Sequence, residues 1–227
     1  MQEVLLQKLN KLNLKKLIYL SPLGWVISKT LNLLSVFSRP YMVYGYTSKH
    51  NGKFLKNTRL SSSTVINSPQ NLIIADNVWV WHHSVLDASN GISIGKSCQI
   101  GAFVGIFSHS SHIAIRLMGD KYLETDINDR VGYIKEKVEI GSYVFIGSST
   151  LIYPGTTIGN GCIVLSGSHV KGNIPDFSVV SGNPAKIITT IDNIDRLYLK
   201  NKLVQENYFN KELLNKMLEK FKITKYE

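Results

Sequence analysis

A six-residue period in the aliphatic residues runs through the second half of the chain. Its positions are Ile140, Ile146, Ile152, Ile158, Val164 and Val170. An earlier block repeats the period with one two-residue slip, at Ile74, Val80 and Leu86 and then at Ile94, Ile100 and Ile106. A helix face would repeat about every 3.6 residues and a strand of an antiparallel sandwich every two residues. A period of six is instead a repeat signature of the parallel β-helix.

The second block has another inward position in each repeat. The fourth residue after each aliphatic residue is small or apolar, at Val144, Thr150, Thr156, Cys162 and Ser168. Gly, Ser, Asn and Lys fill most of the positions between. This pattern suits a narrow three-sided prism with about eighteen residues per coil. We therefore expect Ile140 to stack on Ile158 and Ile146 on Val164, at the ~4.8 Å spacing of neighbouring strands.

The period divides the chain into one core domain with appendages, which 227 residues with 44% apolar content can support. We predict a mainly β fold, with a helical segment at residues 1–45, a β-helix at residues 46–190 and a helical segment at residues 191–227. A loop at residues 107–137, where the period vanishes, extends from the middle of the solenoid. In the C-terminal segment, leucines and Phe221 among many charges predict one or two amphipathic helices that pack rather than bind.

The N-terminal segment is rich in leucine and lysine. A membrane-spanning helix needs ~20 uninterrupted apolar residues, and this stretch is interrupted by Pro22, Gly24, Lys29 and Asn32. It has no small-residue cleavage site that would make it a signal peptide. Two interpretations stay open. Either two short helices pack on the solenoid or on a neighbouring subunit, or one interfacial helix directs four lysines at anionic lipid, namely Lys8, Lys11, Lys15 and Lys16.

A net charge of +10 favours an anionic partner, such as a phosphorylated cofactor, an acidic polysaccharide or a membrane surface. We expect no nucleic acid partner, because the sequence has neither a zinc-finger spacing nor a basic-aromatic RNA motif. Cys98 and Cys162 both fall at inward repeat positions. They are predicted to be packed thiols rather than a disulfide or a nucleophile.

Two motifs give the solenoid a family resemblance. IGSYVFIG opens the second block at Ile140, and GNPAK, from Gly182 to Lys186, follows a valine-rich segment at its end. Together with the period and the loop, they resemble the hexapeptide-repeat acyltransferases over residues 66–188. The resemblance implies a left-handed parallel β-helix and a homotrimer with active sites between subunits. It also implies transfer of an acyl group, usually acetyl from acetyl-CoA, to a hydroxyl or amine, with no metal.

The same resemblance implies a histidine base where the first block ends. A thioester is already activated, so the enzyme has to align the acceptor and remove its proton. Here the chain reads IFSHSSHIAIRL, and His109 and His112 compete for the role. Aligned at Ser108 with the Y-T-A-T-H run of sugar-acetylating members, His112 lies one residue beyond the expected position and His109 two residues short, which favours His112. His82 and His83 could line the same groove.

Residues for coenzyme A follow from the same alignment. Phe145, Ser148 and Ser166 become neighbours of the thioester and pantetheine, and Lys171 and Lys186 approach the phosphates as point charges. Phe145 replaces the tryptophan that is usual in the family and cannot donate a hydrogen bond. The loop is longer than in the small sugar acetyltransferases, and some of its side chains suit a sugar acceptor: Arg116, Tyr122, Glu124, Asp126 and Arg130.

The resemblance favours a cytoplasmic, membrane-associated O-acetyltransferase that acts on a sugar hydroxyl of a bacterial capsule, lipopolysaccharide or exopolysaccharide. Two other functions stay open. A γ-class carbonic anhydrase-like protein would bind zinc through His83, His109 and His112, although GNPAK and the long loop favour the transferase. A solenoid scaffold would have lost catalysis. The sequence names neither the acceptor nor the hydroxyl or amine that is modified.

Overall fold

The computed structural model describes residues 21–226. The chain forms two compact units, one ending at Pro40 and the other beginning at Tyr41. The first contains helix α3 (Pro22–Ser38), which begins at Ser21, whose hydroxyl accepts a hydrogen bond from the Gly24 amide. Among the described residues, no helix is long and apolar enough to cross a membrane. The four lysines of the predicted interfacial helix lie outside the described residues.

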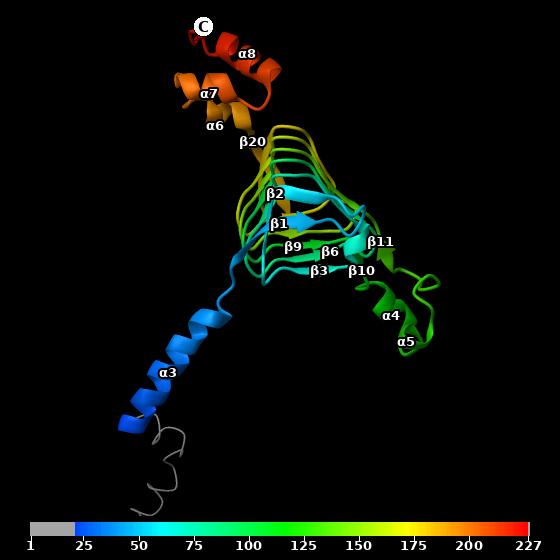
Figure 1. Ribbon diagram of the computed structural model, residues 1–227. Helices are drawn as coiled ribbons and strands as arrows, with labels where there is room; N and C mark the ends of the chain where they lie inside the picture. Colours follow the sequence, from blue (N-terminus) through cyan, green and yellow to red (C-terminus); the bar gives the residue numbers. More distant parts are fainter. Residues whose placement is uncertain (1–20, 227) are drawn as a thin grey trace, which may run out of the picture. The chain divides into compact units, whose positions relative to one another are not determined.

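The second unit contains a solenoid of three sheets (Figure 1). The first sheet has the order β1 (Met42–Thr47), β2 (Phe54–Ser61), β5 (Trp79–Val80), β8 (Gln99–Ile100), β13 (Phe145–Ile146), β16 (Ile163–Val164), β19 (Ser178–Gly182) and β20 (Ala185–Thr190). The second has β17 (His169–Val170), β14 (Leu151–Ile152), β9 (Gly105–Phe107), β6 (Val85–Asp87) and β3 (Val65–Asn67). The third has β18 (Asn173–Ile174), β15 (Thr157–Ile158), β12 (Val138–Ile140), β7 (Ile92–Ile94) and β4 (Leu72–Ile74), which follows a 3-10 turn at Pro69–Asn71.

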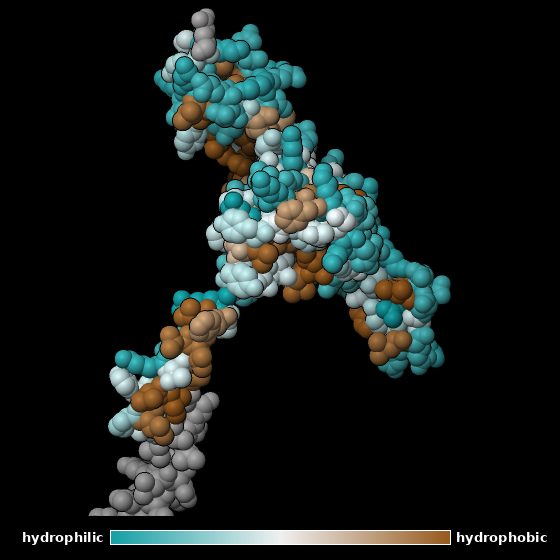
Figure 2. Space-filling view, in the orientation of Figure 1, coloured by the Kyte–Doolittle hydropathy of each residue, from teal (hydrophilic) through white to brown (hydrophobic). Residues whose placement is uncertain are grey.

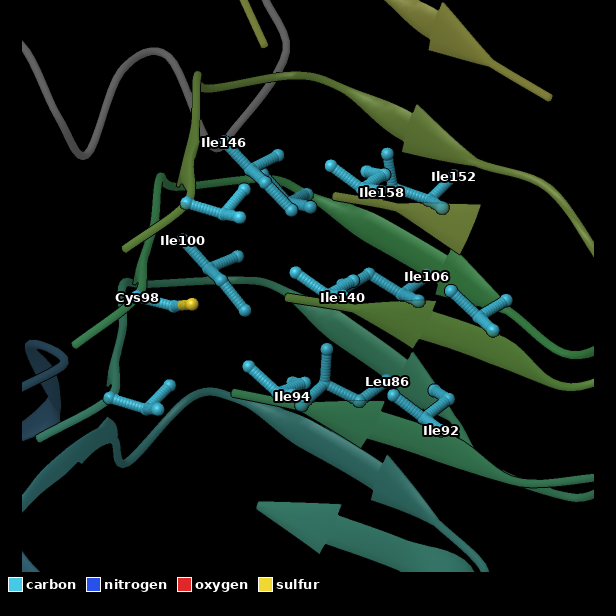
Figure 3. Packing of buried hydrophobic residues seen from close by; sticks show 14 of the residues in the cluster. Leu86, Ile92, Ile94, Cys98, Ile100, Ile106, Ile140, Ile146, Ile152 and Ile158 are labelled. Atoms are coloured by element: carbon cyan, nitrogen blue, oxygen red, sulfur yellow. The ribbon is translucent and has the colours of Figure 1, made fainter. Parts of the chain in front are cut away.

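The stacking of coils follows the six-residue period. Ile140 pairs with Ile158 and Ile146 pairs with Val164, as predicted. All the aliphatic positions of the period are buried in one core. Figure 3 shows part of it, with Ile100, Ile146 and Ile158 among the residues labelled. The coils of the first block are two residues longer, since Leu86 pairs with Ile106. The two-residue slip is therefore an enlarged corner, where the Gly91 amide donates to the Ala88 carbonyl. A parallel β-helix is confirmed.

The corners of the prism position the side chains that matter for function. What we call the first corner joins the first sheet to the second, at residues 81–84, 101–104, 147–150 and 165–168. The second corner joins the second sheet to the third. Buried hydroxyls satisfy corner carbonyls: Thr156 donates to Tyr153 at 2.7 Å and Ser168 to Leu165 at 2.5 Å. The polar inward residues therefore stabilise the corners by hydrogen bonds, while the aliphatic residues fill the core.

The mid-solenoid loop leaves the second corner after β9 and returns at β12. Its base is a two-stranded antiparallel ribbon of β10 (His109–Ser110) and β11 (Ile134–Lys135), in which His109 pairs with Lys135. Between them lie the short helices α4 (Ala114–Met118) and α5 (Lys121–Glu124). The loop is therefore an ordered insertion, and Val138 resumes the solenoid by pairing with Ile92.

Three helices follow the solenoid, where the sequence predicted one or two. They are α6 (Ile191–Asp195), α7 (Lys202–Asn207) and α8 (Lys211–Lys220). The division arises because Asn201 and Asn210 each cap a new helix, accepting from the amides of Leu203 and Leu213. Their core consists of Leu199, Leu214, Met217 and Leu218. Phe209 joins this cluster to the solenoid, with its ring centre 4.9 Å from that of Tyr143.

Candidate active site

Asp87 and His109 meet at the second corner, where the loop leaves the solenoid. Nδ1 of His109 lies 3.3 Å from Oδ1 of Asp87. This is ion-pair distance without the alignment of a hydrogen bond, so Nδ1 is left without a hydrogen-bond partner among the described residues. The His109 ring stacks on Tyr133 of the loop, with ring centres 5.6 Å apart and planes 13° apart. The imidazole is therefore positioned between a carboxylate and an aromatic ring.

The Asp87 carboxylate is held in its charged form. Burial raises the pKa of Asp87, but hydrogen bonds from the hydroxyl and amide of Ser89 and from the Asn67 amide, together with nearby His109, outweigh this and lower its pKa below the usual 3.8. An ionised carboxylate beside Nδ1 favours the tautomer that carries its proton there. Nε2 of His109 then has a free lone pair, as a general base requires.

His112 lies in a different environment at the same corner. Its side chain is exposed, and its Nδ1 is 2.7 Å from the Ser110 hydroxyl. It lines a pocket of about 280 Å³. The other lining residues are Ser110, Ile134, Tyr153, Pro154 and Lys171. The structure therefore brings His109, His112 and Lys171 to the second corner, but only His109 has a carboxylate partner.

The first corner holds another pocket, of about 250 Å³. It is lined by Trp81, Gln99, Gly101, Ala102, Phe145 and Ser148. Two glycines allow neighbouring coils to approach each other beside this pocket. A Cβ on Gly101 would come within 2.7 Å of the Ser148 amide nitrogen, and a Cβ on Gly147 would come within 2.4 Å of the Ser166 amide nitrogen. Glycine is thus required where these coils approach each other, and neither position projects a side chain into the groove.

The remaining predicted cofactor residues continue along the first corner. Ser166 follows β16, whose Val164 pairs with Val180 of β19. In the closing hairpin, Ser181 of β19 pairs with Lys186 of β20, and the peptide bond between Asn183 and Pro184 is cis. Phe145, Ser148, Ser166 and the exposed Lys186 therefore belong to one edge of the prism, and Lys171 to another. The predicted cofactor residues are divided between two corners of a single chain.

His82 and His83 lie at the first corner, whereas His109 and His112 lie at the second corner of the same chain. The prediction that Val80 stacks on Ile100 is confirmed, but the side chains after Val80 turn toward a different edge from those after Phe107. His82 Nδ1 lies 2.6 Å from the Ser61 hydroxyl, and His83 stacks on Phe103 at 5.1 Å. One chain therefore does not bring His83, His109 and His112 together. Among residues 21–226, no cluster of three or more His, Cys, Asp or Glu could hold a metal ion.

Both cysteines are packed thiols, as predicted. Cys98 is 1% exposed and Cys162 is fully buried. Burial raises the pKa of Cys98 to about 11 and also raises that of Cys162. Neither thiol is positioned or ionised as a nucleophile would be.

The family model of the bacterial transferase hexapeptide (six repeats) matches residues 137–172. Residues 137–172 are therefore similar to the hexapeptide repeats of this family. The resemblance of the chain to the hexapeptide-repeat acyltransferases is confirmed, and the match falls on the second block, where the period was most regular.

Curated proteins similar to this chain have acetyltransferase names. WbbJ of Escherichia coli (strain K12), provisionally named a lipopolysaccharide biosynthesis O-acetyl transferase, is 31% identical over 130 residues, 57% of this chain and 65% of WbbJ. A provisionally named acetyltransferase of Saccharomyces cerevisiae is 32% identical over 127 residues, 55% of this chain and 59% of that protein. The matched stretch spans less than two thirds of either relative.

Among solved structures, a maltose O-acetyltransferase from Clostridium difficile 630 has a TM-score of 0.47 and 25% identity, covering 57% of this chain and 64% of that chain. A galactoside acetyltransferase in complex with coenzyme A has a TM-score of 0.49 and 25% identity, covering 59% of this chain and 62% of that chain.

Two residues near the candidate site escaped the sequence analysis. Asp87 precedes the enlarged corner, and its partner in the next coil is Phe107, two residues before His109. Extending the coil register past Ile106 could have found it. Trp81 lies directly after Val80, in the segment where only the histidines were considered. Its side chain is 43% exposed and lines the first-corner pocket.

Proposed function

We propose that this protein is an acetyl-CoA-dependent O-acetyltransferase that modifies a sugar hydroxyl in bacterial surface polysaccharide. The observation that carries the proposal is His109 held beside an ionised Asp87, at the mouth of an ordered loop on a solenoid of transferase repeats. The acetyltransferase names of the relatives, WbbJ among them, support the reaction class and the sugar acceptor.

In the proposed reaction, Nε2 of His109 removes the proton of the acceptor hydroxyl as its oxygen attacks the thioester carbonyl. The C–O bond forms, the tetrahedral intermediate collapses, and the C–S bond breaks. The histidine then returns the proton to the coenzyme A thiolate. Asp87 stabilises the imidazolium that forms in between, which is the role of the carboxylate in other histidine-centred sites.

His109 is proposed as the base in preference to His112. The alignment of the motif favoured His112 by a single residue, whereas Asp87 gives His109 an oriented ring and a stabilised charged form. His112 has only a hydroxyl partner and an exposed side chain. We assign His112 to contact with substrate in the second-corner pocket.

The donor is proposed to lie along the first corner. Ala102, Ser148 and Ser166 are small residues of successive coils, so a narrow pantetheine arm can lie between Phe145 and this edge. Lys186, at the C-terminal end of the solenoid on the same edge, is exposed and suits a phosphate. In an earlier coil of the same corner, the exposed face of Trp81 offers the flat apolar surface on which the C–H face of a sugar ring packs.

A homotrimer would unite the two corners into one site. The base and Lys171 belong to the second corner, and the proposed donor groove belongs to the first, with the width of the second sheet between them. A three-fold assembly places the second corner of each subunit against the first corner of the next, because heterologous contacts close into a ring. The division of the predicted residues within one chain supports this arrangement.

Release of free thiol from acetyl-CoA, measured over a panel of sugars and nucleotide sugars, tests the reaction. We expect release that depends on both the sugar and the protein, with acetate recovered as an ester on the sugar. Binding of coenzyme A by calorimetry without turnover on any sugar would favour an amine acceptor. Absence of coenzyme A binding would favour the non-catalytic scaffold.

A further inference from the structure

The positive charge of the chain is concentrated in its first third. Residues 1–75 contain ten of the 26 Lys and Arg residues but only one of the 16 acidic residues, Glu3, and so carry a net charge of +9 of the chain's +10. Residues 76–227 are almost neutral, with 16 basic and 15 acidic side chains. Such an asymmetry attracts an anionic partner to one part of the molecule.

Helix α3, within this basic third, has an apolar stripe at helical spacing. The stripe consists of Leu23, Val26, Ile27, Leu33, Leu34 and Phe37. Most of it is exposed, from 51% at Val26 to 83% at Phe37, and the helix is mostly brown in Figure 2. Ser28, Asn32 and Ser35 lie on the other side together with the exposed Trp25 and Val36, and the helix has no acidic residue. A wide exposed apolar face without acidic residues suits a helix that lies in the plane of a membrane surface.

Trp25 and Lys29 add an interfacial anchor to α3. The Lys29 ammonium lies over the Trp25 ring, 4.3 Å from its centre, and both side chains are exposed. Tryptophan and lysine gather at the level of lipid headgroups, where an apolar ring and a cation are both accommodated. At 17 residues, or ~25 Å, α3 is too short to cross the bilayer but long enough to lie on it.

The β1–β2 hairpin of the second unit repeats the combination of cations and apolar rings. Lys49, Lys53 and Lys56 are exposed and form no ion pair with any residue from 21 to 226. Phe54 and Tyr44 of the same hairpin are 61% and 69% exposed. Cations that no carboxylate neutralises remain available to an external anionic surface.

We propose that helix α3 lies on an anionic lipid bilayer, with its apolar stripe in the boundary between headgroups and acyl chains, and that the lysines of the hairpin contact lipid headgroups independently of α3. A bilayer accepts apolar side chains and cations at the same time. A nucleic acid would leave the stripe in water. A second copy of the chain would cover the stripe but would offer the cations no anionic surface. The inference does not depend on the proposed acyl transfer.

Sedimentation of the full chain with vesicles tests the proposal. We compare vesicles of phosphatidylcholine with vesicles of phosphatidylcholine and phosphatidylglycerol at about 3:1. We expect binding to the anionic vesicles that is at least tenfold tighter, and that weakens as salt rises from 0.1 to 0.5 M, since salt screens the lysines. Equal binding to both vesicles, or to neither, overturns the proposal.

Matched variants separate the apolar stripe from charge in general. Phe37→Glu places a carboxylate in the stripe, and Asn32→Glu places the same carboxylate on the other side of α3. We expect the first to lose more than tenfold in vesicle binding and the second several-fold less. Equal losses would mean that vesicle binding depends only on the net charge of the protein, and would contradict insertion of the stripe.

A second pair of variants tests the hairpin. Replacing Lys49, Lys53 and Lys56 by Gln removes three charges from the basic third, and replacing Lys200, Lys202 and Lys225 removes three from the neutral remainder. We expect only the first to weaken vesicle binding, about tenfold or more. Equal effects overturn the assignment to the first third. Self-association that Phe37→Glu abolishes, without vesicle binding, would instead assign the stripe to a second copy.

Discussion

Nδ1 of His109 faces Oδ1 of Asp87 across 3.3 Å, although the two residues are 22 positions apart in the sequence. The solenoid creates this contact, since β6 and β9 are neighbouring strands of one sheet and Asp87 pairs with Phe107. The contact assigns different tasks to the two histidines of the loop. His109 has a carboxylate to stabilise its charged form, and His112 does not.

His109→Ala should therefore lower kcat by about 10²–10⁴, the usual contribution of a positioned general base. His112→Ala should lower it less and act mainly on the KM of the acceptor. Both variants should still bind coenzyme A by calorimetry, because neither side chain belongs to the first corner. If His112→Ala is the inactive variant and His109→Ala is not, the alignment of the motif was right and the base is His112.

Asp87→Asn is the companion test of this assignment. It should lower kcat by about 10- to 100-fold, the usual effect of losing a group that orients another. Asp87→Glu keeps the carboxylate beside the imidazole and should retain more of the wild-type kcat than Asp87→Asn. Equal losses of kcat in Asp87→Asn and Asp87→Glu would mean that the charge beside His109 is not used in the reaction.

The lowered pKa of Asp87 also predicts a pH dependence of stability. A carboxyl whose pKa is lower in the folded chain stabilises the fold fully above its unfolded pKa of about 3.9, and loses this contribution as pH falls through the folded value. Thermal unfolding should therefore show wild type more stable than Asp87→Asn at pH 5–7, with the difference shrinking toward pH 3. The exposed Asp120→Asn serves as the control and should show no such convergence.

The period of aliphatic residues was enough to predict the coils. Burial at Ile140, Ile146, Ile158 and Val164 follows from a simple rule, since each inward position is repeated and stacks on its own kind. The GNPAK motif marked the end of the solenoid for a similar reason: it is local in sequence. These parts of the fold could be predicted because they depend on residues close together in the chain.

The candidate site was harder to predict because corners, unlike strands, do not repeat one residue pattern. Sequence spacing put His82 near His109, but the chain turns at the first corner after Val80 and at the second after Phe107. Asp87 was missed because its partnership with His109 runs between coils. The number of C-terminal helices depended on the side-chain caps Asn201 and Asn210, which a pattern of leucines does not reveal.

Lys186→Glu should weaken binding of coenzyme A by about 1–3 kcal/mol, the scale of a charge-assisted contact with a phosphate. The side chain is exposed, so the fold should be unaffected. Calorimetry with coenzyme A and with dephospho-coenzyme A measures the effect and shows which phosphate is involved. Lys200→Glu, an equal charge reversal on the C-terminal helical segment, is the control. Unchanged affinity in Lys186→Glu would mean that the closing motif is structural here.

Two inactive variants should restore activity to each other if the site lies between subunits. His109→Ala removes the base at the second corner, and Ser148→Trp fills the exposed first-corner pocket that we assign to the donor. The Ser148→Trp chain keeps an intact second corner, and the His109→Ala chain keeps an intact first corner. In trimers assembled at random from equal amounts of both chains, about one interface in four brings these two intact corners together.

Co-expression with two different tags and tandem purification isolates the mixed trimers, and thiol release from acetyl-CoA measures their activity. We expect at least a quarter of wild-type activity from mixed trimers, against almost none from either variant alone, because the tandem step removes the trimers that cannot complement. A mixture as inactive as its parents, with both variants shown to fold and assemble, would place the base and the donor in the same chain. The two corners would then have to be joined by another route, and the trimeric site would be wrong.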